Sequence, residues 1–295
     1  MLSMISYIRK KIKYSRMIGY TTEYSEKAER LNCKKGGGML TAEEHSRMSE
    51  IDFQKHFKSE QTLIKWYFSY LENINHLSVV STAGVLIKET KAKNILSFGC
   101  GPAVNELLLK CAFQDDIRMV VTDYDEFMMK GIQRICGDKV DAQTFDFYKD
   151  NPCRIINQYN IDTVIMIGSA CSMDDKTYIK FLRKIKKTKV KYILTFEAGI
   201  QKEWMRIFYP FGLVLKTICL YFFNRNEYND RLEYMENRVT YHAFNRTISE
   251  LKHIYRKGGF QYTRIGPTKN RYYQTYTNSF LLYSKDTDWR KQVEK

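Results

Sequence analysis

Short runs of apolar and β-branched residues alternate with longer amphipathic stretches in the part of the chain that follows Lys93. Five of these runs have the length and composition of buried strands: 95–98, 119–122, 142–145, 163–167 and 192–196. The stretches between them repeat apolar residues every three or four positions, which is typical of helices packed on a sheet. This alternation predicts βαβ units and a mostly parallel sheet.

The last part of the chain has a different pattern. Apolar residues recur at helical spacing from Phe244 to Tyr255, and Gly258 and Gly259 follow, which is the residue type that ends a helix in a left-handed cap. Two β-rich segments, 260–265 and 277–283, come next. They predict an antiparallel hairpin that closes one edge of the sheet and brings it to seven strands, with helices on both faces.

The first 92 residues differ from the rest, being charged, rich in Ser and Thr, and interrupted by Gly36, Gly37 and Gly38. We expect an amino-terminal arm there, followed by helices at 59–77 and 79–90 that pack on the core. The predicted organisation is an arm and helical extension at 1–92, a main domain at 93–284 with an aromatic insert at 201–238, and a tail at 285–295.

Composition limits the classes of protein to consider. The chain has 295 residues, 44% of them hydrophobic, and 48 Lys and Arg against 33 Asp and Glu give a net charge of +15. This charge fits an anionic partner such as nucleic acid or acidic lipid, and it equally fits a well-solvated surface. The seven cysteines form no C-x-x-C pair, so we predict no disulfide framework and no metal site, and we expect a cytoplasmic protein.

One long apolar run, 207–223, raises the question of a membrane. Pro210, Gly212 and Lys216 interrupt it, and it is shorter than the roughly 20 residues that span a bilayer. Residues 1–20 are basic but lack the features of a secretory signal. We therefore expect no membrane span, and peripheral contact with an anionic membrane stays open.

The strand at 95–98 leads into the turn Gly99-Cys100-Gly101-Pro102-Ala103, with Pro102 placed as in the first turn of a helix. Glycines there let a ligand approach the bare backbone, and the free N–H groups of the helix favour a polar group. Asp123 follows the next strand about 20 residues later, where an acid can bind ribose hydroxyls. Alternatively, Asp123 caps the helix that starts near Tyr124.

Val104 stands where a dinucleotide fingerprint needs Gly or Ala. The turn instead resembles the first motif of class I, Rossmann-like S-adenosylmethionine-dependent methyltransferases, and the resemblance extends over about two thirds of the chain, from 93 to 284. Residues 120–123, 144–147 and 161–168 are similar to the next three strands of that family. The fold this implies is α/β and Rossmann-like, with S-adenosylmethionine as the cofactor.

The resemblance also implies which residues contact the cofactor. Asp123 would bind the ribose, Asp146 the adenine amine, and Phe147 would pack on the adenine ring. The remaining expected contacts come from the first strand and the turn after it, and from the residues that follow the second and fourth strands: Ser97, Gly99, Cys100, Gly101, Tyr124 and Gly168. Ser97 departs from the family, which often has an acid there near the amino-acid end of the cofactor. Lys187-Thr188-Lys189 also replaces the usual Pro-Gly-Gly turn.

Methyl transfer depends mainly on alignment of the two reactants, so a catalytic base is optional. His242, before the last helix, and Glu197, at the end of the fifth strand, are the candidate catalytic residues. Asp174 and Asp175 are further candidates, although both also fit a helix cap. The loop 168–175 is expected to face the transferred methyl group, as in the family.

Three kinds of function remain open. The first is a methyltransferase for a small molecule or glycan, which could be lipid-linked, acting on an oxygen or nitrogen nucleophile. The second is an RNA methyltransferase, which the charge suits, although no RNA-binding module and no N-P-P-Y tetrapeptide is present. The third is a methyltransferase-like protein that binds partners without catalysis. Transfer of another group of the same cofactor is a further alternative.

Overall fold

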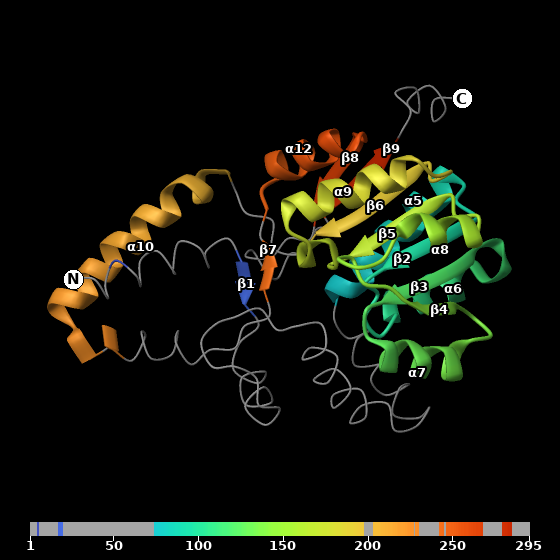
Figure 1. Ribbon diagram of the computed structural model, residues 1–295, viewed down its shortest axis with the longest axis horizontal. Helices are drawn as coiled ribbons and strands as arrows, with labels where there is room; N and C mark the ends of the chain where they lie inside the picture. Colours follow the sequence, from blue (N-terminus) through green and yellow to red (C-terminus); the bar gives the residue numbers. More distant parts are fainter. Residues whose placement is uncertain are drawn as a thin grey trace. The chain divides into compact units, whose positions relative to one another are not determined.

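The computed structural model describes residues 5, 17–19, 74–197, 203–226, 228–229, 242–244, 246–267 and 279–284. Contacts divide the chain into two compact units. One unit comprises Ser49–Ile200 and Glu250–Lys295, and the other comprises Met1–Met48 and Gln201–Ser249. Figure 1 labels the elements of both units. The predicted aromatic insert thus groups with amino-terminal residues, whereas the three-part organisation stays a prediction.

A seven-stranded sheet forms the first unit, in the order β4-β3-β2-β5-β6-β9-β8. Its strands are β2 (Asn94–Phe98), β3 (Arg118–Asp123), β4 (Asp141–Thr144), β5 (Thr163–Ile167), β6 (Tyr192–Glu197), β8 (Gln261–Pro267) and β9 (Ser279–Ser284). The first five strands in this order pair in parallel. Strand β9 runs antiparallel to both β6 and β8. The predicted parallel α/β core is confirmed, and the two late β-rich segments are β8 and β9.

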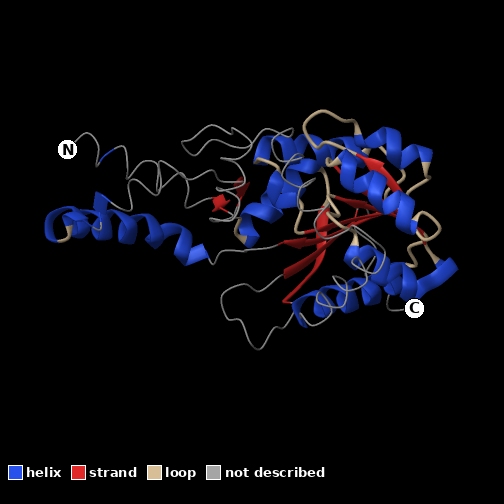
Figure 2. Cartoon of the chain, turned by 90° about the horizontal axis from the view of Figure 1, so that it is seen from below, coloured by secondary structure: helices blue, strands red, loops and turns tan. Residues whose placement is uncertain are grey.

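Helices cover both faces of this sheet, as Figure 2 shows. On one face lie α5 (Ile74–Thr90), α6 (Val104–Phe113) and α7 (Glu126–Cys136), and on the other lie α8 (Pro152–Gln158), α9 (Asp175–Lys186) and α12 (Ile248–Gly258). Neighbouring strand residues alternate between the two faces: Ile95 packs with α5–α7, and Leu96 packs with α8, α9 and α12. The strands are buried on both sides, which explains their continuous apolar composition.

A buried polar link joins the second helical layer to the sheet. The Tyr255 hydroxyl on α12 is hydrogen-bonded to the Tyr178 hydroxyl on α9, at 2.5 Å, and to the Thr195 hydroxyl on β6. All three side chains are buried. Because buried hydroxyls are costly when they lack partners, this shared arrangement fixes how α9 and α12 lie against β6.

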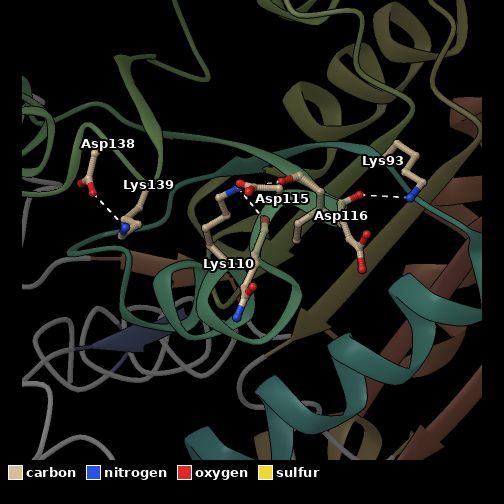
Figure 3. A network of polar contacts seen from close by, with 8 residues as sticks. Lys93, Lys110, Asp115, Asp116, Asp138 and Lys139 are labelled. Atoms are coloured by element: carbon tan, nitrogen blue, oxygen red, sulfur yellow. Dashed lines mark hydrogen bonds and ion pairs between the residues drawn. The ribbon is translucent and has the colours of Figure 1, made fainter.

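Charged side chains form hydrogen bonds with the backbone at the amino-terminal ends of the strands. The Asp162 carboxylate, before β5, accepts from the backbone N–H groups of Lys93 and Asn94, at 3.0 and 2.9 Å. Lys93 and Lys110 donate to backbone carbonyls of the segment 114–117, which leads into β3 and includes the short helix η1 (Gln114–Asp116). Figure 3 shows the contacts of Lys93 and Lys110. They belong to the edge opposite the glycine turn.

Some predicted boundaries were wrong. The turn residue Ala103 has a left-handed backbone, with φ 57°, so α6 begins at Val104 and Pro102 precedes the helix instead of lying in its first turn. Phe244, expected in the last helix, lies in a strand. Gly259 has φ 89°, which agrees with the expected left-handed cap after α12. Of the helix expected at 59–77, residues 59–73 lie outside the described residues, and the described helix α5 begins at Ile74.

In the other unit, β1 (Met17–Gly19) pairs antiparallel with β7 (His242–Phe244). The same unit contains the 21-residue helix α10 (Glu203–Phe223), which carries most of the aromatic residues of the insert. Across the described parts of both units, no helix combines the length and the apolar character that crossing a membrane would require.

Candidate functional site

The site lies where the strand order reverses. From β2 the chain proceeds outward to β3 and β4 on one side, and it then returns to β5 and continues to β6 on the other. In open parallel sheets, ligands bind at this point, beyond the carboxyl ends of the two central strands. Here those ends lead into two loops, 99–103 after β2 and 168–174 after β5.

Three glycines in these loops have left-handed backbones: Gly99 with φ 67°, Gly101 with φ 54° and Gly168 with φ 68°. A Cβ atom added at Gly101 or Gly168 would meet no protein atom within 4 Å. The space in front of these two residues is therefore open to a ligand. The sequence expectation of bare backbone at a binding site is consistent with this geometry.

Gly99 has a different function. A Cβ atom at this position would lie 2.4 Å from the Ser169 Cβ. Ser169 also donates a hydrogen bond from its hydroxyl to the Phe98 carbonyl. Gly99 is thus required for the loop after β5 to pack against the turn after β2, which assembles the two halves of the site.

Asp123, at the end of β3, holds the turn. Its carboxylate accepts from the Gly101 N–H at 2.9 Å and from the Asp125 N–H at 3.3 Å. Asp123 does not cap the following helix, because the N-cap of α7 is Asp125, which accepts from the Met128 N–H. A carboxylate offers about four acceptor positions, so capacity remains for ribose hydroxyls.

Glu106, on the first turn of α6, is the functional residue that sequence reasoning missed. The Ser97 hydroxyl donates to one of its carboxyl oxygens at 2.6 Å, while the other oxygen, Oε2, is buried and has no hydrogen-bond partner within the described residues. Glu106 is 1% exposed. The Glu106 carboxyl group therefore lies beside Ser97, near the carboxyl end of β2. An acid in the first helical turn after Ser97 was the available signal.

The carboxyl groups of Glu106 and Asp123 lie close enough to each other and to the Cys100 thiol to shift pKa values in this group. Burial raises the pKa of the Glu106 carboxyl to about 7, and the nearby Asp123 adds to this rise. Burial also raises the pKa of Asp123 to about 6, while its two backbone hydrogen bonds oppose the shift. The Cys100 thiol has a pKa raised well above its usual value by burial and then by both acids. Within the described residues, neither carboxyl group has an ion-pair partner.

The residues expected to hold adenine lie after β4. The Asp146 carboxylate accepts from the Tyr148 N–H at 2.8 Å and lies 3.6 Å from the Lys149 ammonium, so it is engaged in its own turn. The Phe147 ring packs with Phe98 and Phe181, with centroids 6.0 and 5.3 Å away. The ring also lies 3.5 Å from a Cβ added at Gly99, which places it beside the turn. The adenine contacts of both residues stay predictions.

The Tyr148 hydroxyl links this segment to the loop after β5 by donating to the Ser172 carbonyl at 2.9 Å. Ser172 ends the short helix η2 (Ala170–Ser172). The loops after β2, β4 and β5 therefore form one connected rim. Tyr124 is the first residue after β3 and is half-buried. Its contact with the cofactor stays a prediction.

The candidate bases lie in different elements. Asp174 is the N-cap of α9, where it accepts from the Thr177 N–H, and Asp175 is exposed in the first turn of that helix. Glu197 is the last residue of β6, at the carboxyl edge of the sheet. His242 lies in β7 of the other unit, where it pairs with Gly19. Catalytic roles for Glu197 and His242 stay predictions.

No cluster of three or more potential metal ligands occurs in the part of the chain that the structure describes. No protein-family model and no curated protein matches the chain.

Solved structures match its fold. One is magnesium protoporphyrin IX methyltransferase from Synechocystis PCC 6803 with bound SAH, at 14% identity and a TM-score of 0.48, covering 72% of this chain and 84% of that one. Another is human N-acetylserotonin methyltransferase in complex with SAM, also at 14% identity and a TM-score of 0.48. The match covers 80% of this chain and 59% of that one. These TM-scores are below 0.5, so the function proposed below rests on this chain's own residues.

Proposed function

We propose that this protein is an S-adenosylmethionine-dependent methyltransferase of the class I, Rossmann-like type. The observation that carries the proposal is the pair of buried acids, Glu106 and Asp123, beside an open glycine turn. Two carboxyl groups buried without a cation destabilise a fold, because each loses hydration. A ligand that brings positive charge to the turn would offset this cost.

The charge of the site favours this cofactor over a dinucleotide. S-adenosylmethionine carries an ammonium and a sulfonium group, whereas a dinucleotide brings a pyrophosphate. Two acids beside the turn would repel phosphates and attract cations. Val104, at the position where a dinucleotide fingerprint needs Gly or Ala, agrees with this preference.

The chain's own residues would hold the cofactor as follows. The backbone at Gly101 and Gly168 provides the surface on which it lies, since neither position has a side chain in the way. Asp123 would accept from the ribose hydroxyls, and Glu106 would attract the ammonium group. When bound, the cofactor supplies an electrophilic methyl group, and the loop 168–174 would align the acceptor with it.

For the acceptor we propose a small molecule with an oxygen or nitrogen nucleophile. In this proposal the loop 168–174 and the carboxyl end of β6 border the place where the acceptor binds. Glu197, at the end of β6, is the candidate to take the proton of a hydroxyl acceptor. Catalysis without any protein base remains compatible with an amine acceptor, because methyl transfer depends mainly on alignment.

The test is calorimetric titration of the purified protein with S-adenosylhomocysteine, with NAD as the control ligand. We expect binding in the micromolar range for S-adenosylhomocysteine and none for NAD. Binding of NAD alone would overturn the proposal. The absence of binding for both ligands would favour a protein that binds partners without catalysis.

Two glycine variants separate binding from folding. Gly101→Ala is expected to fold, with a cost of about 1 to 2 kcal/mol for a left-handed alanine, and to weaken S-adenosylhomocysteine binding at least about tenfold by filling the ligand's space. Gly99→Ala is expected to lower stability more, because its Cβ overlaps Ser169. Thermal unfolding and calorimetry of both variants check this. Unchanged binding by a folded Gly101→Ala variant would show that the ligand lies elsewhere.

A further inference from the structure

Helix α10 carries a group of exposed apolar side chains. Among the described residues, ten large apolar side chains are exposed, and five of them lie on α10. These five are Phe208 (62% exposed), Phe211 (72%), Leu215 (65%), Phe222 (69%) and Phe223 (88%). Monomeric soluble proteins seldom expose apolar residues in such concentration unless the surface is used.

The exposed residues form a stripe. Phe208, Phe211, Leu215 and Phe222 are separated by three, four and seven positions, and exposed Cys219 fills the gap. At about 100° per residue, these five positions fall within about 80° of the helix circumference. We call the five residues Phe208, Phe211, Leu215, Cys219 and Phe222 the α10 stripe.

The opposite side of α10 faces protein. Thr217, on that side, is 3% exposed. Tyr221 packs edge-on against Tyr228, with ring centroids 5.3 Å apart, and the Arg225 guanidinium lies 4.0 Å from the Tyr221 ring centroid. A polar threonine is therefore buried while phenylalanines are exposed, which is the reverse of an ordinary surface helix.

The charge around the stripe identifies the occupant. Acidic residues occur only at the borders of the segment 203–227, Glu203 at the start of α10 and Glu227 after it, whereas Arg206, Lys216 and Arg225 between them are basic. Lys216 is exposed. Two copies of such a segment would meet with like charges, whereas an anionic lipid surface complements it. Helices that lie in the membrane interface combine an aromatic apolar face with basic residues in this way.

We propose that α10 docks the protein on the surface of an anionic bilayer, with the α10 stripe inserted among the acyl chains. The helix lies in the plane of the interface, and Lys216 reaches the acidic headgroups. This places the enzyme where an acceptor partitioned into the membrane is concentrated. The α10 stripe and the candidate cofactor site belong to different units.

The experiment is flotation of the full chain with two kinds of vesicle, phosphatidylcholine alone and phosphatidylcholine mixed with phosphatidylserine. The triple variant F211S/L215S/F222S removes most of the stripe. The matched control is Val85→Ser, an exposed apolar side chain on α5, 51% exposed. Calorimetry with S-adenosylhomocysteine accompanies both variants, so that failure of docking and failure of cofactor binding are seen separately.

We expect the wild type and Val85→Ser to float with the phosphatidylserine vesicles and to be released by high salt. The triple variant should bind at least about tenfold more weakly while keeping its cofactor affinity. Failure of the wild type to float would overturn the proposal, as would equal flotation of the triple variant. A wild-type dimer that the triple variant converts to monomer, without flotation, would instead assign the stripe to a second copy.

Discussion

Glu106→Gln is expected to weaken S-adenosylhomocysteine binding by about 10- to 100-fold while leaving the affinity for 5′-methylthioadenosine unchanged. The two ligands share adenine and ribose, and only the first has the amino-acid end with its ammonium group. Glutamine keeps the size of the side chain and can still accept from Ser97, so only the charge is lost. Calorimetry with both ligands on both proteins measures the difference.

The pH dependence provides a second readout of Glu106. Because burial raises the pKa of this carboxyl to about 7, it carries its full charge only above neutral pH. The affinity of the wild type for S-adenosylhomocysteine should therefore rise from pH 6 to pH 8. The Glu106→Gln variant should lack this step. A variant with the wild-type pH profile and equal loss of both ligands would show that Glu106 acts only in folding.

The same substitution should stabilise the fold at alkaline pH. A carboxyl whose pKa is raised in the folded protein favours folding below its unfolded pKa, and this contribution is lost as the pH rises through the folded value. A rise from 4.5 to about 7 corresponds to roughly 3 kcal/mol. The free energy of unfolding of Glu106→Gln should exceed that of the wild type at pH 8 and not at pH 4. Denaturant titrations at the two pH values measure this.

Glu126→Gln is the matched control for both readouts. Glu126 also lies in the first turn of a helix, α7, but it is exposed and paired with Lys130 at 2.7 Å. Its replacement should leave both ligand affinities unchanged. Because pairing with Lys130 lowers the pKa of Glu126, the replacement should not raise the free energy of unfolding at pH 8, in contrast to Glu106→Gln. Together, the two variants distinguish a buried acid that binds a ligand from an acid that only interacts favourably with the amino-terminal end of a helix.

The sequence was sufficient for the sheet and the turn, because both depend on local patterns. Buried parallel strands are apolar throughout, and a left-handed turn needs glycine, so β5 was predicted at its observed bounds and Gly101 at an open position. The predicted place of Pro102 in the first helical turn was wrong because Ala103 has a left-handed backbone, which comes from the turn as a whole and not from the preference of alanine.

What the sequence could not give were contacts between distant positions. The hydrogen bond from Ser97 to Glu106 depends on how α6 leaves the turn, and the packing of Gly99 against Ser169 joins residues 70 positions apart. The choice of Asp123 or Asp125 as the cap of α7 was likewise decided by backbone geometry and not by residue type. Sequence alone therefore predicted the glycine turn and Asp123 as parts of the candidate site but did not identify Glu106.

Asp123→Ala is expected to weaken both S-adenosylhomocysteine and 5′-methylthioadenosine by about 1 to 3 kcal/mol, because both ligands contain the ribose. Part of the loss comes from the turn, since the Gly101 N–H loses its acceptor. Asp123→Asn, which keeps one acceptor oxygen, should fall between the wild type and the alanine variant. Calorimetry with the two ligands gives the comparison.

The control for Asp123 is Asp162→Ala at the opposite edge of the sheet. Asp162 also accepts from two backbone N–H groups, those of Lys93 and Asn94, but it lies at the amino-terminal ends of the strands. Its loss should lower the free energy of unfolding without changing either ligand affinity. If Asp123→Ala behaved in the same way, the Asp123 carboxylate would be a support for the turn and the ribose assignment would be wrong. Suppose that Asp123→Ala weakens the binding of both ligands, whereas Glu106→Gln weakens the binding of S-adenosylhomocysteine alone. The two acids would then be assigned to the two ends of one cofactor.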